Sequence, residues 1–282
     1  MGVFVDRGYR TLLGLPFYDR VRELEFLSEL LGAARTVVVY GPRNVGKSEL
    51  ARYYAQRRSP GSPFLLVDAR RRSAEGLGLA RPGVLRELLG LADKLLSGAL
   101  RAPSLVGLAE GVSRVYRSLG PGPITVVVDE FHLLYTSRRE ALLELERAAG
   151  YLAKRGEPGA RLVVTSSEGF VTLGSARRRL LGYSAGYLPV EGLDKGHMEA
   201  LYSDYRARYS CGLGFKVYWG VFGGSPGYLV EACSLGEERL FRDYIPGVLR
   251  DVVDEAIASI SAELSEPPSK VLEQASRILG GP

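Results

Sequence analysis

Residues 41–48 are the feature that most constrains what this chain can fold into. They fit the pattern G-x-x-x-x-G-K-[ST] of the phosphate-binding P-loop and are Gly41, Pro42, Arg43, Asn44, Val45, Gly46, Lys47 and Ser48. The β-branched run before them predicts a buried strand over residues 36–40, and the run after them predicts a helix over residues 49–55. In this order of strand, loop and helix, backbone N–H groups and the positive end of the helix converge on a phosphate. The chain is therefore expected to hold an α/β domain with a phosphate site.

Each position of the motif suggests a role. Gly41 and Gly46 allow the tight turn and the close approach of the backbone that a Cβ would block. Lys47 is expected to reach the β- and γ-phosphates, and the Ser48 hydroxyl to be a ligand of Mg²⁺. Glu49 follows directly and completes the predicted nucleotide-binding segment.

The pattern of strands and helices predicts a parallel sheet with helices on both sides. Further strands are expected over residues 63–68, 124–128, 161–165 and 187–190, and helices over residues 21–33, 83–99, 104–118 and 138–154. Pro189 places the last strand at an edge, and residues 70–82 are expected to form a loop rich in Gly and Arg. We therefore predict a P-loop NTPase α/β domain over residues 1–194.

The region after residue 194 is expected to be all helical. Helices are predicted over residues 195–209, 214–222, 226–235, 237–259 and 268–279. We interpret residues 195–282 as a smaller helical lid, and leave open whether its end is the start of a truncated winged helix. Three tyrosines recur there at helical spacing: Tyr202, Tyr205 and Tyr209. We expect them either to pack in the core of the lid or to form a surface on which bases stack.

Composition limits the classes of function. With 282 residues, the chain suits one large domain or a core with a small appendage. It has no apolar run long enough to span a membrane, and Asp6, Arg7 and Arg10 stand where a signal peptide needs an apolar core, so a cytoplasmic protein is expected. The net charge of +5 permits nucleic-acid binding without indicating it. Cys211 and Cys233 lie far apart and are expected to be buried apolar residues.

A second strong signal is the acidic pair that ends an apolar strand, Asp129 and Glu130. This fits a Walker B element, in which Asp129 holds Mg²⁺ through water opposite Ser48 and Glu130 orients and deprotonates the attacking water. A water-activating Glu favours hydrolysis over transfer to a substrate hydroxyl, and no GTPase base-recognition motif N/T-K-x-D is present. His132 completes the pattern D-E-x-H, which is found in a class of helicases. Those helicases need two motor domains, which argues against this class. We interpret His132 either as a surface residue that starts a helix or as a contact of the γ-phosphate.

Polar residues also end the next strand. Ligands of parallel sheets lie at the carboxyl ends of the strands, so a hydroxyl here is expected near the γ-phosphate, in the role called sensor 1. Ser166 is the first candidate and Ser167 the second.

Together these elements resemble the archaeal-type P-loop ATPases of the AAA+/STAND group, relatives of the Orc/Cdc6 initiators. The resemblance covers about residues 12–260 and, besides the P-loop and the Walker B and sensor strands, includes residues 17–24 and 223–229. The first resembles the F-x-x-R-x-x-E-L box beside the adenine, which implies a nucleotide contact for Arg20. The second resembles the G-G-x-P-x-Y-L segment of the lid, which implies that Pro226 reaches the nucleotide.

The chain departs from these relatives at two places. Where they carry Gly-Arg after the sensor strand, this chain has Gly182 and Tyr183, so the arginine that neutralises the γ-phosphate is missing or is supplied from residues 177–179. The relatives also commonly continue into a winged helix or nuclease-like domain, where this chain stops. Residues 70–72 form another arginine run, either facing solvent or contacting an acidic partner, nucleic acid or a neighbouring subunit.

The sequence thus predicts an ATP-binding protein with Mg²⁺-dependent ATPase activity that acts as a nucleotide-driven switch. ATP and Mg²⁺ are the expected cofactors, and a protein partner or a second copy of the chain is the expected recipient of the signal. Two alternatives stay open: a DNA-associated initiator- or loader-like protein in which ATP licenses nucleic-acid binding, and a STAND-type signalling scaffold.

Overall fold

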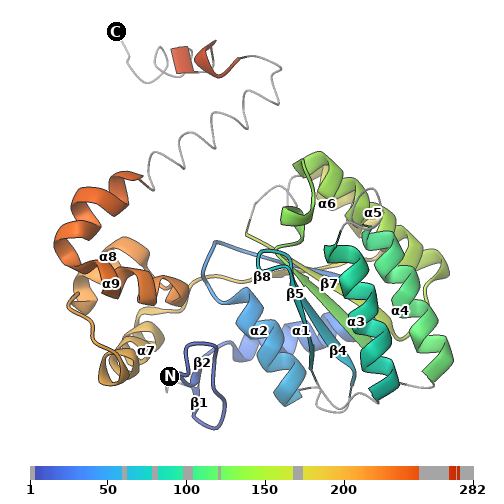
Figure 1. Cartoon of the computed structure of the whole chain (residues 1–282), viewed down its shortest axis with the longest axis horizontal. Helices are drawn as coiled ribbons and strands as arrows, with labels where there is room; N and C mark the ends of the chain where they lie inside the picture. The colour runs from blue at the N-terminus through green and yellow to red at the C-terminus, as the bar shows by residue number, and fades with distance from the viewer. Residues whose placement is uncertain are drawn as a thin grey trace. The chain divides into compact units, whose positions relative to one another are not determined.

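The chain divides into two compact units (Figure 1). The first contains the residues up to Ala207 together with Phe222–Tyr228, and the second contains Arg208–Val221 and the residues from Leu229 onward. The boundary between a P-loop domain and a lid at residue 194 remains a prediction. The computed structural model describes residues 4–58, 62–77, 82–97, 104–119, 122–167, 174–247, 267–270 and 272–273.

The strands of the first unit form two sheets. They are β1 (Val5–Asp6), β2 (Phe17–Tyr18), β3 (Thr36–Tyr40), β4 (Phe64–Asp68), β5 (Ser73–Leu77), β6 (Ile124–Asp129), β7 (Ala160–Ser166) and β8 (Gly186–Pro189). β1 and β2 pair antiparallel, and the others form a six-stranded sheet in the order β5-β4-β6-β7-β3-β8. In that sheet β3, β4, β6, β7 and β8 run parallel, and β5 pairs antiparallel with β4. The predicted P-loop fold with a largely parallel sheet is confirmed, as is the edge position of β8.

The register brings the carboxyl ends of the central strands to one edge of the sheet. Tyr40 at the end of β3 is the Cα partner of Ser166 on β7, and Asp68 at the end of β4 is the partner of Asp129 on β6. The loops that follow these strands therefore leave the sheet at the same edge, where β7 separates the start of the P-loop from the acidic pair by one strand.

Helices are described in both units. They are α1 (Val21–Ala33), α2 (Lys47–Tyr53), α3 (Pro82–Leu96), α4 (Leu105–Leu119), α5 (Arg138–Arg155), α6 (Gly174–Leu181), α7 (Lys195–Arg208), α8 (Phe215–Phe222) and α9 (Leu229–Arg239). Short π- or 3-10-helical segments follow α2 (Tyr54–Arg58), β6 (Phe131–Leu134) and α9 (Leu240–Tyr244), and precede α9 (Pro226–Tyr228). None of the helices in the described part of the chain is both long and apolar enough to cross a membrane.

The core consists of two apolar layers, one on each face of the large sheet. Along β6, Val126 and Val128 pack into the layer with α3, α4 and α5, while Val127 between them packs into the layer with α1 and α2. This alternation follows from the period of two along a strand, and it requires apolar residues at every position of a strand covered on both faces. Figure 1 shows the two helical layers on either side of the strands.

The prediction of a loop over residues 70–82 is wrong in part. Ser73–Leu77 forms β5, the edge strand that makes the sheet mixed. Its first four residues alternate between exposed and partly buried, and only Leu77 at its end is buried. The segment therefore lacks the apolar run of its neighbours. Pairing with β4 creates this strand, because local propensity in β structure is easily outweighed by tertiary context.

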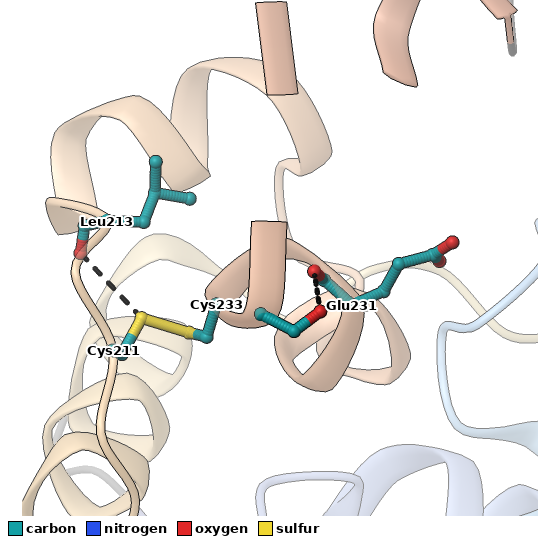
Figure 2. Close-up of a disulfide and its surroundings, with 5 residues drawn as sticks. Cys211, Leu213, Glu231 and Cys233 are labelled. Atoms are coloured by element: carbon teal, nitrogen blue, oxygen red, sulfur yellow. Dashed lines mark hydrogen bonds between the residues drawn. A yellow bond between two sulfur atoms is a disulfide. The ribbon is translucent and has the colours of Figure 1, made fainter. Parts of the chain in front are cut away.

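The second unit contains a disulfide between Cys211 and Cys233 (Figure 2). Cys211 precedes α8 and Cys233 lies on α9, and the fold brings their Cα atoms to 4.7 Å across a sequence separation of 22 residues. The prediction of two separate apolar cysteines is wrong, because distance in sequence says nothing about their proximity in the folded helices. The bond joins the segments before and after α8.

The helices predicted near the end are described only in part. Residues 226–235 begin as the turn Pro226–Tyr228 and continue into α9, whose helical geometry is interrupted at Gly236, with φ of 69°. Of the helix predicted over residues 237–259, the described part ends at residue 247, and of the helix over 268–279 only residues 268–270 and 272–273 are described, all helical. The rest of both predictions lies outside the described residues.

Candidate active site

The loop between β3 and α2 has a backbone that only glycine fits at its two ends. Gly41 has φ of 154°, and a Cβ there would lie 1.9 Å from the carbonyl oxygen of Val190. Gly46 has φ of 102° and caps the N-terminus of α2. Since L-residues avoid this conformation, the two glycines set the path of the chain and direct the first N–H groups of α2 toward the loop. The result is a concave nest suited to an anion.

Lys47 is buried beneath this loop, with only 4% of its surface exposed. Its ammonium group donates to the carbonyl oxygens of Gly41, at 3.0 Å, and Pro42, at 2.8 Å. Its Nζ also lies 3.7 Å from Oε1 of Glu130. Burial lowers the pKa of Lys47, because the charged form is poorly solvated there, while the nearby carboxylates oppose the shift. Its hydrogen bonds to the loop thus fix a buried ammonium group beside the nest.

The Walker B aspartate faces the hydroxyl that ends the P-loop. Ser48 Oγ donates to Oδ2 of Asp129 at 2.6 Å, and the Thr165 hydroxyl donates to Oδ1 of the same carboxylate. Burial raises the pKa of Asp129, and the two hydroxyl donors oppose that shift by stabilising the ionised form. A carboxylate and a hydroxyl oxygen in contact form a donor set that suits Mg²⁺.

Glu130 sits at the strand exit with its carboxylate held in place. Its φ is 49°, a conformation uncommon for a residue other than glycine. Oε2 accepts from the backbone N–H of Ser167, at 3.0 Å, and from its hydroxyl, at 2.8 Å. The N–H of Glu130 donates to Oγ1 of Thr165 at 2.9 Å. The backbone and carboxylate of Glu130 are therefore both fixed by the end of β7.

The polar side chains at the end of β7 lie on opposite faces of the strand. Thr165 and Ser167 bond the acidic pair, whereas Ser166 is fully buried, with its hydroxyl 3.5 Å from Nδ1 of His132. Thr165 was not selected from the sequence, although alternation along a strand puts positions 165 and 167 on the same face. The interpretation of His132 as a surface residue is wrong, since only 7% of it is exposed.

A cavity of about 360 Å³ opens beside the nest, within the first unit. Its volume lies within the range of small-molecule pockets. Among the residues selected from the sequence, its lining includes Arg20, Asn44, Val45, Gly46, Lys47, Ser48, Glu49, Asp129, Glu130 and Pro226. Gly41, Pro42, Arg43 and Ser166 lie outside this lining. The cavity therefore brings together residues from segments far apart in the sequence.

Two of these segments are attached to the P-loop by hydrogen bonds. Arg20, buried at the start of α1, donates to the carbonyl oxygen of Val45 at 2.8 Å. The N–H of Gly227 donates to the carbonyl oxygen of Asn44 at 2.9 Å, and a Cβ on Gly227 would lie 2.7 Å from that of Asn44. Pro226 thus lines the cavity from a segment that is in close contact with the loop.

Glu49 connects α2 to the segment between β1 and β2. Its carboxylate accepts from the hydroxyl of Tyr9, at 2.8 Å, and from the N–H of Leu12, at 3.4 Å. Burial raises the pKa of Glu49, and these two donors oppose the shift. Because Leu12 and its neighbours line the cavity, Glu49 fixes one wall of it.

Two of the three arginines of α6 have partners outside the cavity. The guanidinium of Arg177 lies 5.4 Å from the ring centre of Tyr187, and Nε of Arg179 lies 2.9 Å from Oε1 of Glu146. None of residues 177–179 lines the cavity.

The residues present fit a nucleotide with its metal ion. The glycine at position 41 lets the loop pass close to the carbonyl group of Val190. The nest, the buried ammonium of Lys47 and the contacting oxygens of Ser48 and Asp129 together suit a triphosphate with Mg²⁺.

Comparisons with known proteins identify the family and the fold. The family model described as an ATPase domain predominantly from Archaea matches residues 17–232. A Walker-type ATPase of Pyrococcus abyssi is similar in structure, with a TM-score of 0.50, 21% identity, and coverage of 88% of this chain and 75% of the other. At this identity the likeness shows the fold.

Two ORC proteins of Aeropyrum pernix are also similar. The ORC1 protein in complex with DNA has a TM-score of 0.47 and 15% identity over 86% of this chain and 67% of its own. The ORC2 protein in ADPNP–ADP complexes has a TM-score of 0.43 and 20% identity over 73% of this chain and 57% of its own. The comparison with curated proteins gave no match.

Proposed function

The chain belongs to this family of ATPase domains found predominantly in Archaea, and we propose that it is a Mg²⁺-dependent ATPase that acts as a nucleotide-driven switch. One observation carries the proposal: the buried ammonium of Lys47 and the Ser48–Asp129 pair meet at one cavity beside a glycine-bounded nest. We assign to these groups the roles of metal ligands and phosphate-binding cation that phosphoryl transfer requires.

Binding of ATP follows from the charges of the site. The N–H groups of the loop and the start of α2 bind phosphate oxygens, and Lys47 exchanges part of its contact with loop carbonyls for the β- and γ-phosphates. Ser48 and Asp129 would hold Mg²⁺, which when bound neutralises charge on the phosphates. Arg20 and Pro226 line the part of the cavity that we assign to the rest of the nucleotide.

Hydrolysis needs a base close to the terminal phosphate, and we assign that role to Glu130. The oxygen of a water molecule attacks the γ-phosphorus, its proton passes to the Glu130 carboxylate, and the bond from the γ-phosphorus to the bridging oxygen breaks. The products are ADP and inorganic phosphate. Thr165 and Ser167 position the base through their hydrogen bonds to its backbone and carboxylate.

The switch is assigned to the segment Phe222–Tyr228. Gly227 is hydrogen-bonded to the P-loop at Asn44, and the chain continues from this segment into α9. A change in the loop on loss of the γ-phosphate would alter that bond and the position of Pro226. Such a nucleotide-dependent change in a local contact is the usual origin of switching.

The experiment that tests the proposal is thermal unfolding with and without ATP and Mg²⁺. With free ATP at about 100 times its Kd, the parental protein should gain about 2.7 kcal/mol in free energy of unfolding. Lys47→Ala should show no such gain, because the phosphates lose their buried cation. Lys154→Ala is the matched control, since Lys154 lies over the ring of Tyr183 and outside the cavity. An undiminished ATP effect in Lys47→Ala would contradict the proposal.

A further inference from the structure

The cavity has more positive charge in its wall than the P-loop alone supplies. Among the described residues, its cationic lining consists of Arg20, Lys47, Arg52, Arg70 and Arg71. The lining also holds the carboxylates of Glu49, Asp68, Asp129 and Glu130, so an anionic ligand depends on a cation that these acids and the backbone do not already engage.

Four of these side chains already have acceptors within the protein. Lys47 bonds loop carbonyls, Arg20 bonds Glu23 and Val45, Arg52 pairs with Glu75, and Arg71 pairs with Asp68. Arg70 differs, because no ion pair or hydrogen bond of its side chain is present in the described part of the chain. Its charge also acts on Lys47, whose pKa is lowered mainly by burial and further by Arg70. Arg70 and Lys47 thus line the same cavity.

The backbone around Arg70 is fixed beside the Walker B aspartate. Asp68 and Asp129 are Cα partners in neighbouring strands, and the N–H of Ala69 donates to the carbonyl oxygen of Asp129 at 3.1 Å. On the other side, the N–H of Arg71 donates to Oδ1 of Asp68 at 2.9 Å, which closes the turn. Arg70 therefore projects from a turn that is anchored to β6 next to the acidic pair.

We propose that Arg70 is a cis-acting arginine that binds the terminal phosphate of the nucleotide. The inference rests on the proposed ATPase function and supplies the cation that the sequence left unassigned after the sensor strand. The candidates there, residues 177–179, lie outside the cavity lining, and Arg177 and Arg179 contact Tyr187 and Glu146.

The chemistry of a guanidinium suits this role. It stays protonated, so it takes no part in the proton transfer to Glu130, and its planar N–H donors match the oxygens of a phosphate. Two N–H groups of Arg70 bind γ-phosphate oxygens and stabilise the charge that develops as the bond to the leaving oxygen breaks. An arginine in this position contributes about a thousandfold or more to turnover in other phosphoryl-transfer sites.

The test compares Arg70→Ala with Arg72→Ala. Arg72 belongs to the same turn and is exposed, but lies outside the cavity lining, so its removal changes net charge equally. For each protein, the rise in melting temperature is measured with Mg²⁺–ATP and with Mg²⁺–ADP, and turnover is measured by release of phosphate. Arg70→Ala should lower kcat about a thousandfold and reduce the ATP effect to that of ADP, with the ADP effect unchanged. Arg70→Lys should be intermediate, because it keeps the charge but loses the paired donors.

The outcomes separate the two proposals. If Arg70→Ala keeps the parental turnover and the parental difference between ATP and ADP, the assignment of Arg70 is overturned while the ATPase function stands. If Arg72→Ala shows the same losses, the effect belongs to net charge and the assignment is again overturned. If the parental protein responds to neither nucleotide, the proposed function fails and the role of Arg70 fails with it.

Discussion

Reduction of the disulfide between Cys211 and Cys233 should destabilise the second unit by about 3 kcal/mol. The cross-link spans a sequence separation of 22 residues and so removes freedom from the unfolded chain. With that loop length, the chain-entropy relation gives a loss of about 11 cal/mol/K, or about 3.4 kcal/mol at 25 °C. The effect is large relative to the stability of a typical domain.

A single tryptophan makes this effect measurable in the unit concerned. Trp219 is the only tryptophan of the chain and lies on α8, inside the loop that the disulfide closes. Its ring is partly buried and lies 6.2 Å from that of Phe215 on the same helix, so its fluorescence should change when α8 unfolds and the ring becomes exposed. In urea, with a slope of about 2 kcal/mol/M, reduction should lower the unfolding midpoint followed at Trp219 by about 1.5 M.

The control is a protein in which both cysteines are replaced, Cys211→Ser with Cys233→Ser. It should unfold at the midpoint of the reduced parental protein and should not respond to reductant. A midpoint that is the same in oxidised and reduced parental protein would refute the reasoning, and so would a response to reductant in the double variant.

Two further predictions concern the acidic pair and its support. Glu130→Gln should keep the ATP-induced rise in melting temperature while kcat falls at least a hundredfold, because an amide cannot accept the proton; parental turnover in this variant would remove Glu130 as the base. Thr165→Val should lower the free energy of unfolding by about 1–3 kcal/mol, since the fully buried hydroxyl bonds both Asp129 and the N–H of Glu130. Thr36→Val on β3 is its control, because the buried Thr36 hydroxyl has no hydrogen-bond partner among the residues that the structure describes. Equal losses in the two variants would contradict the role of these bonds.

The central strands of the fold were predictable because their residues alone determine them. Strands such as β6 are apolar at nearly every position, and only a strand covered on both faces needs such a run. The order of P-loop and acidic pair along the chain then placed the site, because parallel strands end at the same edge. These features depend on local sequence and on general rules of topology.

The parts that failed depend on contacts between distant residues. β5 is a strand because β4 offers it hydrogen bonds, and its own Ser, Glu and Gly residues give no sign of this. The pairing of Cys211 with Cys233 likewise depends on how α8 and α9 fold.

The candidate site was predictable in its motifs and less so in its details. The loop and the acidic pair followed from their patterns, whereas Thr165 was missed in favour of Ser166, although alternation along β7 separates them. The positions of Arg70 and of His132 could not be derived at all, because they depend on the turn after β4 and on the burial of the helical turn after β6.

The hydrogen bonds to the P-loop carbonyls lower the entropy cost of binding a ligand. The ammonium group of Lys47 donates to the carbonyl oxygens of Gly41 and Pro42. The N–H of Gly227 donates to the carbonyl oxygen of Asn44, and Arg20 donates to that of Val45. With these acceptors engaged by the protein, the peptide groups of the loop cannot rotate freely. When Lys47 turns to the phosphates, the bonds from Gly227 and Arg20 still hold the loop. The backbone of the proposed anion site is therefore in place before the anion arrives, and association costs little conformational freedom of the loop.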